Sequence, residues 1–208
     1  MRTQLDLVVR VVWIFALSCA AAFAQADFSA EIKNNLTDAN FHTRIFSTTG
    51  KLRFEGADRN GRPNSIMLVD LTKGTSVVLM PQQHQYVENK VPQIPGQGAT
   101  FFQAKNPDDA CGEYQRVAED KNTKCRKIGH ETVNGRDAVK YELSAKDNNG
   151  TEWIDVKIHF PVKWANAVGK GELQNIHEGP QPPELFEIPA GFTKRHYAAP
   201  AKQDAAKP

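Results

Sequence analysis

Apolar and polar residues alternate with a period of two over much of this chain after residue 27. The clearest example is the stretch 151–160, in which every second residue from position 154 onward is Ile, Val or Phe. Such alternation is typical of a β-strand with one face in the core and the other in solvent. The expected core positions are Ile154, Val156, Ile158 and Phe160, and the expected outward positions are Trp153, Asp155, Lys157 and His159.

Turn sequences divide the alternating stretches at short intervals. Asn134-Gly135 is the strongest of them, because both residues tolerate the positive φ angles of a tight hairpin turn. Further turn sequences lie at 48–50, 58–63, 73–74, 147–150 and 169–171. Short strands separated in this way predict an antiparallel meander. We expect about ten strands, near 28–34, 41–47, 51–57, 64–71, 75–80, 84–89, 125–133, 136–145, 151–160 and 162–177, the last long enough for two.

The region between Pro92 and Asn122 breaks this pattern. It begins with a Gly- and Pro-rich loop, followed by the apolar pair Phe101-Phe102. Asp108 or Asp109 then stands where it can cap a short helix. The sequence therefore predicts a helical insertion in an otherwise β fold.

Residues 1–26 have the features of a secretory signal peptide. Arg2 and Arg10 precede an uncharged apolar run over 11–23, and two A-x-A cleavage sites follow it. We expect cleavage after Ala26 and a periplasmic or secreted mature protein.

Three other interpretations of this segment remain open but fit less well. A signal anchor needs a longer apolar run, and a buried first helix would be the only long apolar helix in a chain patterned for strands. A lipoprotein would carry lipid on Cys19, but Ala16 stands where a large aliphatic residue is expected. At the other end, residues 198–208 are small, polar and Pro-bearing, which predicts a disordered tail. The folded domain should therefore span 27–197.

Composition narrows the classes of protein to consider. The chain has 208 residues, of which 40% are hydrophobic and 24% charged, as in a single globular domain with a real core. Lys and Arg number 26 against 24 Asp and Glu, and the two signs are interspersed, which argues against a nucleic-acid partner. No apolar run after residue 26 is long enough for a transmembrane span.

Two cysteines, Cys111 and Cys125, remain once the signal peptide is removed. An even pair in an exported protein is most simply a disulfide, and its loop would contribute about 3 kcal/mol. A metal site would need more ligands, and a redox pair would favour C-x-x-C spacing.

A search for catalytic chemistry finds little. The sequence lacks the nucleophile-elbow, zinc-protease and phosphate-loop motifs. No two histidines have the spacing of metal ligands on one strand or helix. The six are His42, His84, His130, His159, His177 and His196. The neighbouring carboxylates Asp108-Asp109 and Glu119-Asp120 suit solvation and helix capping better than acid-base work. We therefore expect no enzyme activity, no cofactor and no metal.

Several short motifs, taken in order, resemble one family of exported proteins. In the second half these are IGHETVNG at 128–135, WID at 153–155, FPVKW at 160–164 and LFEIPAGF at 185–192. In the first half they are KLRFE at 51–55, IMLVD at 66–70, VLMP at 78–81 and QYV at 85–87. Together they resemble the strand signatures of the outer-membrane lipoprotein-sorting, LolA-like superfamily, over residues 28–194.

The resemblance implies an unclosed, strongly curved antiparallel β-barrel of about ten to eleven strands, with the short helical insertion packed on its concave face. It also implies an apolar trough that holds lipid or lipoprotein acyl chains, gripped by area and shape rather than by polar contacts. The candidate lining residues are Phe46, Leu52, Phe54, Met67, Val69 and Leu79, with Phe101 and Phe102 over them as a core plug or a movable lid.

More than one function is compatible with the fold that the resemblance implies. The leading hypothesis is a periplasmic carrier for lipid or acylated protein. The alternative is an envelope interaction or sensor module that binds a protein segment without transporting lipid. An enzyme acting on envelope polymers would require titratable side chains that converge inside the trough.

Overall fold

One antiparallel sheet dominates the computed structural model, which describes residues 25–34, 43–57, 63–90, 103–117, 122, 124–144, 149–167 and 169–195. Its strands are β1 (Phe28–Asn34), β2 (Thr43–Thr48), β3 (Lys51–Ala57), β4 (Pro63–Asp70), β5 (Thr75–Met80), β6 (Gln85–Lys90), β7 (Lys124–Val133), β8 (Arg136–Ser144), β9 (Asn149–Asp155), β10 (Pro161–Asn166), β11 (Lys170–Glu178) and β12 (Thr193–Lys194). The described helices are short: α2 (Cys111–Val117) and the 3₁₀ turns η1 (Pro81–Gln83), η3 (Pro107–Asp109) and η4 (Pro183–Phe186).

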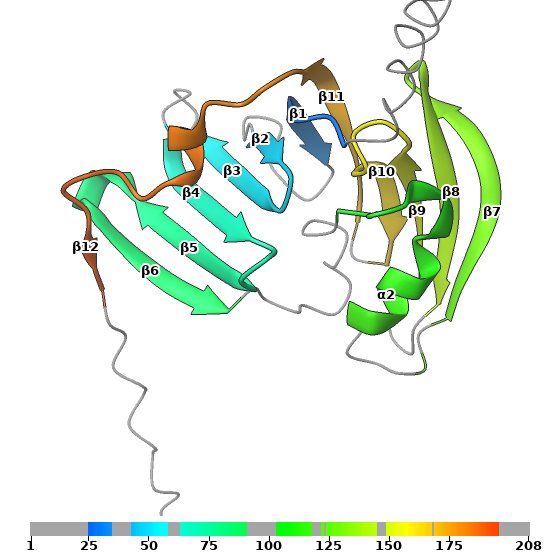
Figure 1. The fold of residues 1–208 in the computed structure, drawn as a ribbon, viewed down its shortest axis with the longest axis horizontal. Helices are drawn as coiled ribbons and strands as arrows, with labels where there is room; N and C mark the ends of the chain where they lie inside the picture. The colour runs from blue at the N-terminus through cyan, green and yellow to red at the C-terminus, as the bar shows by residue number, and fades with distance from the viewer. Residues whose placement is uncertain are drawn as a thin grey trace, which may run out of the picture.

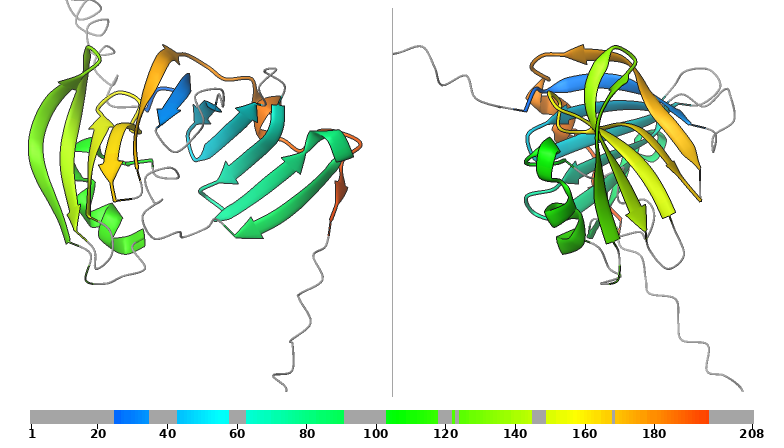
Figure 2. Two further views of the ribbon diagram at one scale, coloured as in Figure 1. Left: turned by 180° about the vertical axis from the view of Figure 1, so that it is seen from behind. Right: turned by 90° about the vertical axis from the view of Figure 1, so that its right-hand side faces the viewer.

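The strands follow the order β12-β6-β5-β4-β3-β2-β1-β11-β10-β9-β8-β7. The sheet curls without closing, so β7 and β12 are its two edges, and α2 lies within the curve beside β7–β9 (Figures 1 and 2). The predicted unclosed antiparallel barrel with a helical insertion is therefore confirmed. The stretch 162–177, expected to be long enough for two strands, forms β10 and β11. One detail was not expected: the two-residue β12 pairs in parallel with β6.

The strand pairings define two faces of the sheet. We call inner the face that carries Leu52 and Phe54, and outer the face that carries Arg53 and Glu55. Segment 103–117 covers part of the inner face, since the Gln103 amide donates to Ser47 Oγ, and Ser47 lies directly opposite Leu52. The C-terminal segment 179–195, here called the strap, crosses the outer face, where Arg53 Nη1 donates to the Leu185 carbonyl.

Three apolar clusters form the core. The largest lies mainly on the inner face and includes Phe28, Ile45, Leu52, Phe54 and Leu173. A second lies under α2, where Ala110 and Tyr114 pack against Val139, Tyr141 and Ile154. The third lies on the outer face and consists of Ile66, Leu68 and Leu79, with Val77, Tyr86 and Phe192 packed against it.

The turn at Asn134-Gly135 confirms the predicted hairpin. Both residues have positive φ, 51° and 81°, and they join β7 to β8. A positive φ costs little at Gly135, which has no Cβ, and Asn tolerates it better than most residues.

The predicted register of 151–160 is wrong beyond residue 154, although three of the four predicted core residues, Ile154, Ile158 and Phe160, are buried as expected. The strand β9 ends at Asp155, whose Oδ1 accepts from the backbone N–H groups of Lys157 and Ile158 and so stabilises a turn. Alternation therefore stops there, and Asp155 is buried in an ion pair with Arg136 rather than exposed. Of the four predicted outward residues only Lys157 is exposed; Trp153 and His159 are buried as well.

Candidate functional site

An apolar row crosses the inner face at right angles to the strands. Cross-strand pairing places Ile45 opposite Phe54, Phe54 opposite Met67, and Met67 opposite Val78. Ala30 extends the row on β1 and Val87 extends it on β6. Because directly opposed side chains lie on the same face, the six residues form one continuous apolar band across six strands.

A second row beside it is apolar in its centre and polar towards β6. It runs through Phe28, Ser47, Leu52, Val69, Ser76 and Asn89. Among the described residues, no inner position of β2–β6 in either row or beyond carries a charged side chain, whereas the outer face of the same strands carries Arg44, Lys51, Arg53, Glu55, Asp70, Glu88 and Lys90.

Four of the predicted lining residues lie on this inner face: Leu52, Phe54, Met67 and Val69. The other two do not, because Phe46 pairs with Arg53, and Leu79 pairs with Ile66, on the outer face. Phe46 and Leu79 therefore cannot line the same trough as the other four, and their prediction as lining residues is wrong. Phe101 and Phe102 lie outside the described residues.

The inner face is closed where its rows cross β3 and β4. Leu52 is 0% exposed and Val69 is 2% exposed. A cavity of about 340 Å³ lies elsewhere, at the end of the β8–β9 hairpin, and its lining is mostly polar. The residues around it are Glu142, Leu143, Ser144, Asn149, Gly150, Thr151 and Ala165. The apolar rows therefore do not border that cavity.

Segment 103–117 begins on the inner face, where hydrogen bonds of the Gln103 and His159 side chains hold it. The Gln103 amide also accepts from Gly50 N and donates to the Thr48 carbonyl, so it holds the β2–β3 turn. Ala104 N donates to the His159 carbonyl, and His159 Nδ1 lies 3.0 Å from the Ala104 carbonyl. His159, expected to face outward, is therefore a buried residue that fixes this segment.

The middle of the segment is held by Tyr141 on β8. Its hydroxyl donates to the Pro107 carbonyl at 2.6 Å and accepts from Ala110 N at 3.3 Å. Burial raises the pKa of this phenol, so it stays protonated and can serve as donor. The expected helix cap at Asp108 or Asp109 is wrong, because Asn106 caps a 3₁₀ turn first and α2 starts only at Cys111.

Asp108 instead forms a charged contact with β7. Its Oδ1 lies 2.6 Å from Lys127 Nζ and 3.0 Å from His130 Nε2. The hydrogen bonds from Lys127 and His130 lower the pKa of Asp108. His130 Nδ1 also contacts Asp137 at 2.9 Å, and these two hydrogen bonds, to Asp137 and then Asp108, raise the pKa of His130.

The end of the segment has a covalent tie and a buried polar contact. Cys111 at the start of α2 is bonded to Cys125 on β7, as the sequence predicted. Three residues along α2, the Tyr114 hydroxyl donates to the carboxyl of Glu152 on β9. Glu152 was missed at the sequence level, although its position is in step with Ile154 and therefore falls on the apolar side of its strand.

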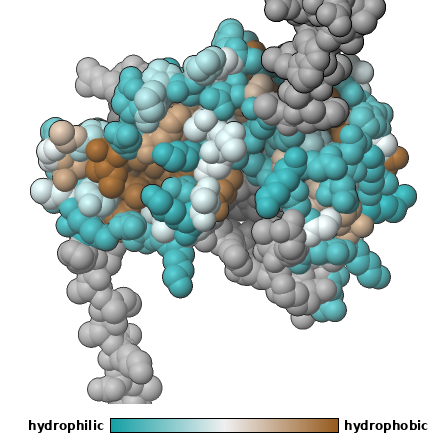
Figure 3. Space-filling view, viewed as in Figure 1, coloured by the Kyte–Doolittle hydropathy of each residue, from teal (hydrophilic) through white to brown (hydrophobic). Residues whose placement is uncertain are grey.

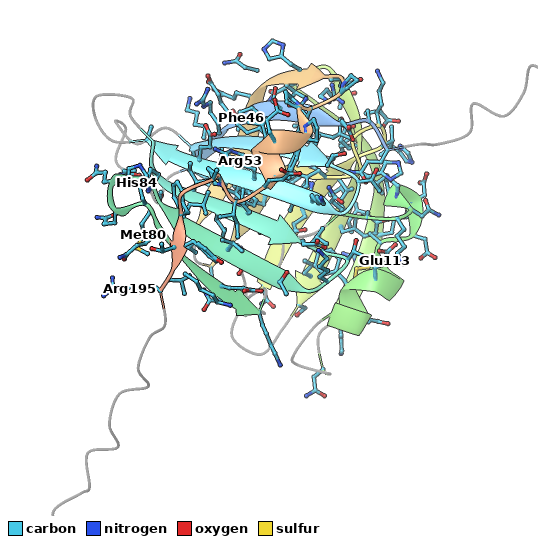
Figure 4. The ribbon with its side chains drawn as sticks, turned by 60° about the vertical axis from the view of Figure 1, so that its left-hand side comes forward. Phe46, Arg53, Met80, His84, Glu113 and Arg195 are labelled. Carbon is cyan, nitrogen blue, oxygen red and sulfur yellow. A yellow bond between two sulfur atoms is a disulfide. The ribbon has the colours of Figure 1, made fainter. Side chains whose placement is uncertain are left out.

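The strap is held on the outer face by a buried ion pair. Arg53 Nε donates to Glu55 Oε1 at 2.7 Å, and both side chains are about nine-tenths buried. Arg44 contacts the other oxygen of Glu55 and lies over the ring of Phe46. Figure 4 shows Arg53 and Phe46 beside the strap, with Met80, His84 and Arg195 near its far end.

The strap also covers apolar surface. Phe192 packs on the outer cluster of β4–β6 and its ring lies 5.6 Å from that of His84. Figure 3 shows apolar residues gathered over this half of the molecule, whereas the half that carries β7 and β8 is mostly hydrophilic. Both faces of β4 and β5 are therefore apolar, one towards the core and one towards the strap.

Neither a metal centre nor a membrane-spanning helix is present in the part of the chain that the structure describes. No group of three or more His, Cys, Asp or Glu side chains there is placed to hold a metal ion. No helix there has the length and apolar character to cross a bilayer.

Comparison with known proteins gives a fold and no closer relationship. No protein-family model and no curated protein matches the sequence. Among solved structures, an uncharacterized conserved protein from Thermus thermophilus matches 82% of this chain and 90% of its own, with a TM-score of 0.53 and 8% identity. The protein PNGF-II matches with a TM-score of 0.52 and 7% identity, over 82% of this chain but only 31% of its own length.

The family expected from the sequence motifs also occurs among the matches. A domain from Vibrio parahaemolyticus assigned to outer membrane lipoprotein sorting covers 77% of this chain and 87% of its own, with 11% identity and a TM-score of 0.33. At these identities the comparisons concern the fold alone and do not assign this chain to a family.

Proposed function

We propose that this protein is an exported, non-enzymatic binding protein of the cell envelope that holds lipid or lipoprotein acyl chains on the inner face of its sheet. The observation that carries this proposal is the uncharged inner face of β2–β6, with its apolar row through Phe54, Met67 and Val78. An acyl chain has no charge to neutralise, so such a face can bind it by area and shape. The signal-like residues 1–26 support an envelope location.

Two adjacent valines on β5 give a matched test of this site. Val78 belongs to the inner row, whereas Val77 faces outward, and both are half-buried. We expect Val78→Gln to weaken uptake of a fluorescent fatty acid about tenfold and Val77→Gln to leave it almost unchanged. Mass spectrometry of lipid extracted from protein purified without detergent should find acyl lipid. Equal effects of the two substitutions would show that the inner face is not the site.

A second candidate function is binding of a protein segment. It is favoured by β12, since a two-residue piece of the strap adds in parallel to β6 through Thr193 and Lys194. An edge that accepts one extended segment can accept another by strand addition. Co-purification of a defined envelope protein, in the absence of lipid and of probe uptake, would favour this function over the carrier.

A further inference from the structure

A carboxyl group is buried beneath helix α2. Glu152 occupies an inner position of β9, with Tyr141 opposite it on β8 and Trp164 opposite it on β10. It is 5% exposed, and the Tyr114 hydroxyl of α2 donates to its Oε2. A polar side chain is thus enclosed by three aromatic residues from three elements.

Among the described residues, no cation is paired with this carboxyl. Of the groups that face it, Tyr141 and Tyr114 are phenols and Trp164 carries no charge; among the described residues no ion pair involves Glu152. Two carboxylates of the covering segment have partners of their own: Glu113 accepts from Lys105 N, and Asp108 contacts Lys127 and His130. Burial therefore raises the pKa of Glu152 to about 8.

A second titrating contact holds the same segment. His130 on β7 bridges Asp108 of η3 and Asp137 of β8, with Lys127 beside it. Its protonated form carries the charge that these carboxylates attract, and their hydrogen bonds raise its pKa. Both groups, one buried and one exposed, therefore hold segment 103–117 in their protonated forms.

We propose that α2 is a proton-controlled flap on the inner face, closed when Glu152 is protonated and released when Glu152 loses its proton. The disulfide between Cys111 and Cys125 keeps the released helix attached at its first residue. Opening withdraws Tyr114 from the buried cluster that contains Val139, Tyr141 and Ile154 on the inner face. This inference goes beyond the proposed function, because it holds whatever ligand the inner face binds.

The direction of the effect follows from proton linkage. A closed flap holds its proton up to about pH 8, whereas an open flap leaves Glu152 in water, with its ordinary pKa of 4.5. Between these two values the closed state binds one more proton than the open state. Each unit of rising pH in that range increases the opening constant about tenfold, and above it the constant levels off.

Amide hydrogen exchange of residues 111–117, corrected for the intrinsic rate at each pH, measures this opening. In the unmodified protein we expect protection of α2 to fall about tenfold per unit from pH 5 to pH 8. Glu152→Gln keeps an acceptor for Tyr114 but cannot ionise, so its protection should vary much less with pH, and the slope that remains should come from His130. Protection of β3 reports global unfolding and should exceed that of α2 at every pH, which separates flap opening from global unfolding.

Three results would overturn the flap: α2 protection independent of pH in the unmodified protein, the same slope in Glu152→Gln, or α2 protection as high as that of β3, which would mean that α2 opens only by global unfolding. If Glu152→Gln does not fold, the carboxyl carbon of Glu152 can be titrated by NMR in the unmodified protein. A midpoint near pH 8 supports the flap, and a midpoint near the ordinary value of a Glu contradicts it.

Discussion

The two halves of the sheet are covered on opposite faces and by different means. Segment 103–117 lies on the inner face of β7–β9, tied by a disulfide and by hydrogen bonds from buried side chains. The strap, 179–195, lies on the outer face of β3–β6, where backbone pairing with β6 and contacts to Arg53 hold it. Each half of the curled sheet is therefore covered on one face by a segment from elsewhere in the chain.

The two covering segments, 103–117 and the strap, should therefore be released from the sheet by different changes. Within 103–117 the contacts converge on ionisable groups, Glu152 and His130, so pH acts on this cover. The strap depends on the buried ion pair between Arg53 and Glu55 and on exposed contacts such as Lys194 with Glu88. Substitution of these side chains is expected to release it.

The strap should fail most severely when the buried ion pair is broken. Glu55→Leu leaves the Arg53 guanidinium buried, with the Leu185 carbonyl as its remaining partner among the described residues. This should cost about 3 kcal/mol or more of the free energy of unfolding. Urea denaturation measures this loss. The double variant Arg53→Leu/Glu55→Leu should recover part of it, and a double variant as unstable as the single one would contradict the ion-pair explanation.

The second largest effect on stability should come from the disulfide that ties segment 103–117 to β7. Replacing Cys111 and Cys125 together by Ala should lower the free energy of unfolding by about 3 kcal/mol, because the unfolded chain regains the entropy of a closed loop. Denaturation of the variant beside the oxidised protein gives the value. A loss confined to α2 exchange, with the denaturation midpoint unchanged, would mean that the tie acts only locally.

Stability should respond to pH through Glu152. Between its ordinary pKa of 4.5 and its folded pKa of about 8, the folded protein holds a proton that the unfolded chain releases, so rising pH favours unfolding. The contribution is up to about 1.4 kcal/mol per pH unit, fully present at the acid end and lost as pH passes the folded pKa. We expect the stability of Glu152→Gln relative to the unmodified protein to rise from pH 5 to pH 8; a constant difference would contradict this.

The smallest effect should come from the exposed end of the strap. Lys194→Ala removes an ion pair with Glu88 in which both side chains are about two-fifths exposed. Surface pairs of this kind are screened by solvent, and we expect no resolvable change in the denaturation midpoint. A large loss would show that β12 anchors the strap more firmly than its two residues of backbone pairing indicate.

Sequence periodicity was sufficient for the strands but not for their faces. The turn at Asn134-Gly135 and the strand boundaries near 51–57 and 75–80 follow from local chemistry, because turn residues and alternation act within a few positions of each other. In contrast, Phe46 and Leu79 were assigned to the inner face on their apolar character alone. The run Ile66-Met67-Leu68-Val69 is apolar on both sides, so it does not specify which side faces the core.

The sequence by itself determined the fold class, the disulfide between Cys111 and Cys125, and the helical insertion that this disulfide ties down. Only the tertiary structure decided that the strap covers the outer face, that β9 stops at Asp155, and that Glu152 lies beneath α2. The reason is physical: turns and alternation depend on neighbours in the chain, whereas the burial of a side chain depends on which distant segment packs over it. Tyr114 and Glu152 are 38 residues apart, and no local pattern brings them together.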